Sequence, residues 1–230
     1  MDQFTLLSNY LNSYEGRDKF LRFFSYSTKF LSGITYGTTT KNFKTISSEM
    51  SNCRVVLRLM DDVPAWHDAL SHEWIRKDTN WISYISDIQT IIDVIYSPIE
   101  SICWAGGRRI ISINTELWDT TTTCFWITSI FLSLIKSVYH IIKLNKYKQC
   151  LNDKSSNRIQ RNKIVVQQRY ELLTCIRLVL DFSYAVSYLP NGTLYGGKLK
   201  TWHVGALGTL SSLIGIYQAL NKRSNSSKSD

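Results

Sequence analysis

The sequence predicts an all-α membrane protein, with an N-terminal amphipathic-helix region and two transmembrane helix candidates in its C-terminal half. Only three prolines occur in 230 residues, and apolar residues recur every three or four positions, as on a helix. Two long segments of the C-terminal half carry almost no charge, and the whole net charge of +9 arises from residues 145–230. Because 44% of the residues are apolar, most of the chain can bury enough surface to fold.

The N-terminal region, residues 1–106, contains an amphipathic helix over residues 17–31. A short helix from Asp2 to Tyr14 comes before it, Gly16 separates the two, and Gly33 ends the second. One face of residues 17–31 is predicted to insert into a membrane, and it consists of Phe20, Phe23, Phe24, Phe30 and Leu31. The predicted lipid-headgroup contacts are Arg17, Lys19, Arg22 and Lys29. The alternative is that this helix packs onto the rest of the chain.

Two further helices are expected in this region, over residues 42–61 and 78–104, and Pro98 should kink the second. The polar segment between them, residues 61–73, reads as a solvated loop because acidic residues and histidines crowd it. A connector, residues 107–119, follows the pair Gly106-Gly107.

The first transmembrane candidate covers residues 120–142. The uncharged part, residues 120–135, is too short for a bilayer of about 30 Å, so spanning requires Lys136 to reach toward one interface. A buried core helix of a soluble bundle is the alternative.

The second transmembrane candidate, residues 201–221, is uncharged over about 31 Å of helix. Trp202 and Tyr217 stand near its ends, where interfacial aromatics are common. Small residues at four-residue spacing predict a helix-packing face made of Gly208, Ser211, Ser212, Gly215 and Ala219, and this face could support oligomers.

Residues 143–200 are expected to form a basic loop followed by an amphipathic helix, residues 164–189, which Pro190-Asn191-Gly192 ends. The polar tail, residues 222–230, is expected to be disordered. Since the cations flank apolar segments, they suit anionic headgroups better than nucleic acid, and no nucleic-acid partner is expected.

The sequence offers no constellation for catalysis. No phosphate-binding loop, dinucleotide fingerprint or C-x-x-C pair occurs, and His67 and His72 are five residues apart, which does not fit a helical metal pair. We therefore expect no catalytic residues, no metal and no cofactor.

The order and spacing of several segments resemble the peroxin eleven family of peroxisomal biogenesis factors, most of all its gamma-type members. The resemblance covers nearly the whole chain and is carried by residues 14–22 (YEGRDKFLR), 53–62 (CRVVLRLMDD), 96–104 (YSPIESICW), 188–192 (YLPNG), 205–212 (GALGTLSS) and 217–218 (YQ). The pair Gly106-Gly107 departs from the expected pattern of a less flexible helix end.

This resemblance implies a multi-pass protein of the peroxisomal membrane with both termini in the cytosol. It implies promotion of membrane protrusion, elongation and fission, with residues 17–31 matching the segment that remodels the membrane. The implied partners are membrane lipids, the chain itself and other family members in homo- and hetero-oligomers, a tail-anchored fission adaptor, a dynamin-like GTPase and the import receptor for peroxisomal membrane proteins. The alternative function is a small-metabolite channel lined by Lys136 and His140.

Overall fold

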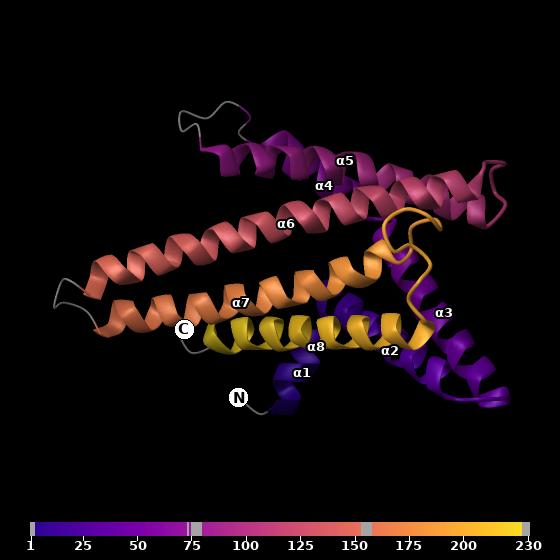
Figure 1. Cartoon of the computed structure of the whole chain (residues 1–230), viewed down its shortest axis with the longest axis horizontal. Coiled ribbons are helices and arrows are strands. Elements are labelled where there is room, and N and C mark those ends of the chain that lie inside the picture. The colour runs from indigo at the N-terminus through magenta and orange to yellow at the C-terminus, as the bar shows by residue number, and fades with distance from the viewer. Residues whose placement is uncertain (1–2, 73, 75–79, 153–157, 227–230) are drawn as a thin grey trace.

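The computed structural model describes residues 3–72, 74, 80–152 and 158–226, and within these ranges the regular structure is entirely helical. The helices are shown in Figure 1. Their bounds are α1 Gln3–Leu11, α2 Tyr14–Ile34, α3 Thr38–Arg58, α4 Asp62–Ser71, α5 Trp81–Gly107, α6 Thr115–Asn152, α7 Arg158–Val186 and α8 Thr201–Ser226.

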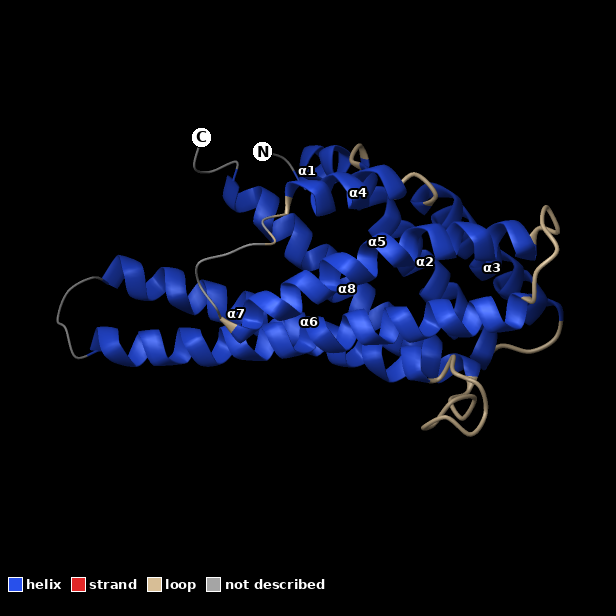
Figure 2. Ribbon diagram, turned by 90° about the horizontal axis from the view of Figure 1, so that it is seen from above, coloured by secondary structure: helices blue, strands red, loops and turns tan. Residues whose placement is uncertain are grey.

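The helices pack side by side in the order α4, α5, α6, α7, α8, α2, α3, and α1 lies against α2 and α8. The antiparallel pair of α6 and α7 is the longest feature, and the ends that adjoin residues 153–157 project beyond the other helices (Figures 1 and 2). The arrangement leaves many helices with one broad face uncovered by protein.

The surface of this bundle is rich in apolar side chains, and its interior is mixed. Large apolar side chains are exposed along α2, α4, α5, α6, α7 and α8. The buried positions are shared between apolar residues and polar ones, the latter being Ser25, Thr28, Ser32, Ser47, Ser97, Ser137, Asp181, Ser187, Ser211, Ser212 and Gln218. Because water does not favour apolar exteriors of this extent, the distribution indicates a lipid environment.

Glycines bring α2 and α8 unusually close together as an antiparallel pair. A Cβ atom on Gly33 would lie 2.6 Å from the backbone nitrogen of Trp202, and one on Gly205 would lie 2.3 Å from that of Phe30. At Gly208 it would lie 2.3 Å from the ring of Tyr26. Of the predicted small-residue positions of α8, Gly208 thus serves contact within the chain, and Gly205, which was not among them, does the same.

One helix of the described part is long and apolar enough to cross a membrane, the segment Thr115–Gln149 of α6. Only 11% of its apolar window is buried in the protein, whereas a core helix of a soluble bundle is mostly buried. The prediction for residues 120–142 therefore coincides with this helix. The segment predicted as a second span lies in α8, which does not meet the same standard of length and apolarity.

Several predicted boundaries differ from the structure. Residues 62–71, expected in a loop, form α4, and Gly16 lies inside α2 rather than between two helices. Ser13 begins α2 by accepting a hydrogen bond from the Gly16 nitrogen at 3.2 Å. Since a Cβ on Gly16 would lie 1.9 Å from the Tyr10 carbonyl oxygen, this glycine permits the sharp corner between α1 and α2.

The C-terminal half is also more helical than the sequence suggests. The basic stretch after residue 142 continues α6 to Asn152 and resumes in α7, and the connector before α6 is confined to residues 108–114. The tail expected to be disordered is helical as far as Ser226, and its remainder, residues 227–230, lies outside the described residues.

Candidate membrane-interacting surface

The aromatic side chains of α2 form a cluster at the molecular surface, called here the aromatic face. The rings of Phe20 and Phe24 are 5.0 Å apart and those of Phe23 and Phe24 are 5.7 Å apart, both edge to face. Phe24 is 42% exposed, and the other two are half-buried. Of the remaining predicted insertion residues, Phe30 lies beside α8 and Leu31 is half-buried.

The opposite, polar face of α2 is the buried one. Ser25 and Ser47 exchange hydrogen bonds between α2 and α3, each hydroxyl donating to the other residue's carbonyl oxygen at 3.1 and 2.8 Å. The Asp18 carboxylate pairs with the Arg54 guanidinium at 2.8 Å. The two alternatives for this helix are therefore compatible, since it packs through its polar face and leaves its aromatic face outward.

A buried polar layer joins α2 to α7 and α8. The Arg22 guanidinium pairs with Asp181 and also donates to the hydroxyls of Tyr184 at 2.8 Å and Ser211 at 3.2 Å. Burial disfavours the charged guanidinium, but Tyr184 and Asp181 outweigh this effect and raise the pKa of Arg22 above its ordinary value. Arg22 thus acts as an internal cation in this arrangement.

The other predicted headgroup contacts also have partners within the chain. Arg17 donates to the Leu11 carbonyl oxygen at 2.9 Å, and Lys19 forms an ion pair with Glu15. Lys29 donates to the Tyr188 hydroxyl at 2.9 Å. Contact of these cations with lipid stays a prediction.

The predicted packing residues of α8 face α2 and α7. Ser211 donates to the Asp181 carboxylate, and Ser212 donates to the Gly208 carbonyl oxygen at 2.7 Å. Gly215 faces Arg177, and Ala219 lines a small cavity beside it. An interface between chains through these residues stays a prediction.

The structure adds a second apolar surface that the sequence reading missed, on α4. Val63 is 76% exposed and Leu70 is 87% exposed, and Met60 and Trp66 are exposed on either side of Val63. The spacing of three and four residues could have revealed this face, but the neighbouring acidic residues and histidines dominated the pattern. The surface available to a membrane is therefore larger than α2 alone.

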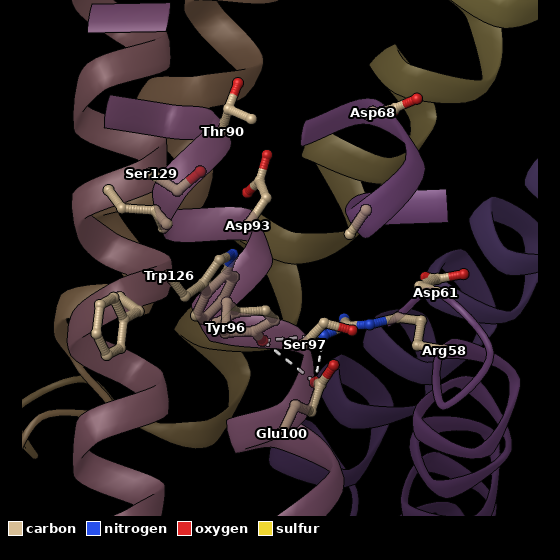
Figure 3. Close-up of a pocket in the computed structure, with 13 residues that line it drawn as sticks. Arg58, Asp61, Asp68, Thr90, Asp93, Tyr96, Ser97, Glu100, Trp126 and Ser129 are labelled. Carbon is tan, nitrogen blue, oxygen red and sulfur yellow. Dashed lines mark hydrogen bonds and ion pairs between the residues drawn. The ribbon is translucent and has the colours of Figure 1, made fainter. Parts of the chain in front are cut away.

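Figure 3 shows a cavity of about 470 Å³ between the end of α3 and helices α4, α5 and α6. The Arg58 guanidinium, at the edge of this cavity, donates to the Tyr96 hydroxyl at 2.9 Å and to the Glu100 carboxylate. Burial is the main cause that raises the pKa of Tyr96 to about 12, with Arg58 opposing the rise and Glu100 adding to it. No group of His, Cys, Asp and Glu suited to a metal occurs in the described residues. Its polar contacts hold α3 to α5.

The two residues predicted to line a channel are both paired. Lys136 donates to the Gln89 side-chain oxygen on α5 at 2.8 Å, and His140 lies 3.8 Å from a Glu171 oxygen on α7. These contacts tie α6 to its neighbours on both sides, and the channel stays a prediction.

An exterior rich in apolar side chains, an apolar α6 and the exposed Phe24 of α2 together point to the class of helical membrane proteins. The chain matches the sequence profile of the family "Peroxisomal biogenesis factor 11 (PEX11)" over residues 4–220, and it belongs to this family. It is therefore a peroxisomal membrane protein involved in peroxisome biogenesis. This result confirms the resemblance inferred from the sequence.

Relatives with the same span support the assignment. The chain is 27% identical over 226 residues to Peroxisomal membrane protein 11C of Homo sapiens, covering 93% of this chain and 92% of that protein. It is 26% identical to Peroxisomal membrane protein 11C of Mus musculus, covering 93% of each, and 26% identical to Peroxisomal membrane protein 11E of Arabidopsis thaliana, covering 96% and 94%. No solved structure matches the chain significantly.

Proposed function

We propose that this protein promotes protrusion, elongation and fission of the peroxisomal membrane by placing the aromatic face of α2 in one leaflet. The observation that carries the proposal is the exposed Phe24, in ring contact with the half-buried Phe20 and Phe23, on a helix whose polar face is buried. Aromatic side chains inserted at the headgroup level enlarge that leaflet and favour positive curvature. The exposed apolar face of α4 adds to the inserted area.

We further propose a multi-pass topology with both termini in the cytosol, which requires a second span such as α8. The partners belonging to this proposal are other copies of the chain and related family members, a tail-anchored fission adaptor, a dynamin-like GTPase and the import receptor for peroxisomal membrane proteins. The family assignment supports these partners only by analogy.

The test reconstitutes the full chain into anionic liposomes and measures tubulation by electron microscopy. Phe23→Glu with Phe24→Glu should abolish tubules because two carboxylates on the aromatic face cannot enter the leaflet. The matched control is Tyr36→Glu, at an exposed residue just beyond α2, which should leave tubulation unchanged. The mechanism would be ruled out if the double variant formed as many tubules as the wild type. Unchanged peroxisome elongation in cells that carry the double variant would also rule it out.

A further inference from the structure

Helices α2, α7 and α8 also pack together at a second level, one helical turn from the polar layer that contains Arg22. One turn toward the N-terminal ends of α2 and α7 and the C-terminal end of α8, Lys19 takes the place of Arg22, Arg177 that of Asp181, and Gly215 that of Ser211. In the first layer the guanidinium of Arg22 meets a carboxylate and two hydroxyls. Helix α7 therefore contributes the acid Asp181 to the first layer and the cation Arg177 to the second.

One donor of the Arg177 guanidinium lacks an acceptor within the described residues. Its Nε atom is buried without a hydrogen-bond partner, and within the described residues the side chain forms no ion pair. The side chain as a whole is half-buried, so the cost falls on this one donor, whose hydration is lost without a replacing hydrogen bond. A bound anion would supply the acceptor through a charge-assisted hydrogen bond.

A cavity of about 330 Å³ occupies the place of the missing acceptor. It is lined by Arg177 and Tyr170 of α7, by Glu15 and Lys19 of α2, and by Gly215, Gln218, Ala219 and Lys222 of α8. Glycine at position 215 keeps it open, since a Cβ there would lie 3.6 Å from the Arg177 Cδ. The volume is at the lower end of small-molecule sites, which are roughly 300–1,000 Å³.

The charges around the cavity favour an anion. Lys19, Arg177 and Lys222 come from three different helices, and Glu15, paired with Lys19, is the one acidic residue of the lining. The planar guanidinium suits two oxygens of a phosphate, and the two ammonium groups supply point charges.

We propose that Arg177, Lys19 and Lys222 form a binding site for a phosphate group. Lys222 follows directly on the uncharged residues 201–221, so the cavity lies at the end of an apolar segment, where lipid phosphates are found. The same chemistry would accept a phosphate in solution. The site is separate from the aromatic face and does not depend on membrane bending.

The experiment measures thermal unfolding of the full chain in a neutral detergent, at constant ionic strength, with three additions. These are inorganic phosphate, short-chain phosphatidic acid and, as the uncharged comparison, phosphatidylcholine of the same chain length. Phosphatidic acid should raise the Tm and phosphatidylcholine should not. If inorganic phosphate also raises the Tm, the site binds free phosphate. If only phosphatidic acid raises the Tm, the site binds lipid.

Arg177→Met should weaken the apparent affinity at least about tenfold, as loss of a charged hydrogen-bonding partner does. It should also raise the Tm without ligand, because it removes a buried donor that has no acceptor. Arg169→Met, at an exposed arginine two turns earlier on α7, is the matched control and should keep the full response.

Gly215→Leu should abolish the response by filling the cavity while all charges remain, and Glu15→Gln should strengthen binding by removing the competing carboxylate. The absence of any shift in the wild type, or an equal shift in Arg177→Met, overturns the proposal. Since no bilayer is used, failure here leaves the bending mechanism of α2 intact.

Discussion

At the scale of single residues, two glycines of α8 have different environments. A Cβ on Gly205 would lie 2.3 Å from the Phe30 backbone nitrogen, whereas one on Gly215 would make an ordinary contact at 3.6 Å. Gly205→Ala should therefore force α2 and α8 apart and destabilise the protein by about 1–3 kcal/mol. Gly215→Ala should stabilise it by roughly 0.5–1 kcal/mol, because alanine favours the helix. Thermal unfolding in detergent measures both, and a change of the same sign in the two variants would contradict the antiparallel contact.

Cys103 has an environment that suppresses its reactivity. Burial is the main cause that raises the pKa of this thiol to about 11, and its hydrogen bond to the Asp119 carboxylate at 2.7 Å adds to the shift. The thiolate fraction at pH 8 is then about a hundredfold below that of an ordinary cysteine. Since a more basic thiolate is also more nucleophilic, we expect iodoacetamide to modify Cys103 at least about tenfold more slowly than the exposed Cys53.

Mass spectrometry of the modified peptides measures this difference, and the rate at Cys103 should keep rising above pH 9. Asp119→Asn should accelerate the reaction at Cys103 and leave Cys53 unchanged. Equal rates at the two cysteines in the wild type would contradict both the burial of Cys103 and its hydrogen bond to Asp119.

At the scale of helices, the buried polar layer fixes α2 to α7. Asp181→Ala should destabilise the protein by about 3–5 kcal/mol, because Arg22 then remains buried without its carboxylate. Adding Arg22→Met should recover most of this loss, since the second change removes the orphaned charge. Chemical unfolding in mixed micelles completes the double-mutant cycle. Additive losses would mean that the two side chains do not interact.

This helix also shows what the sequence can and cannot predict. The spacing of Phe20, Phe23 and Phe24 correctly places them on one face, because periodicity reports which residues share a side of a helix. It does not report what each side contacts, so the burial of Arg22 could not be foreseen. Arg177 was likewise one charge among several on α7, and only the packing of three helices reveals its missing acceptor.

At the scale of the whole molecule, the family and the all-helical fold could be inferred from the chain, whereas the extent of its helices could not. Polar residues at 61–73 and cations after residue 142 are typical of loops, yet both regions are largely helical because neighbouring helices support them. The order of packing, with α2 returning to contact α8, depends on contacts between distant segments, which local periodicity does not encode.

The apolar exterior of the molecule leads to a prediction about its environment. Phe131 of α6 is 49% exposed and lies at the centre of residues 120–142, and Ile142 is equally exposed at their end. If lipid surrounds α6, Phe131→Lys should cost about 3 kcal/mol on insertion scales, while a lysine at position 142 can reach the headgroups. In water, by contrast, a lysine at either exposed position would be harmless. Carbonate extraction of peroxisomal membranes should therefore release or deplete the Phe131→Lys protein and retain the Ile142→Lys protein. Equal retention of both variants would mean that the exposed face of α6 does not meet the hydrocarbon core.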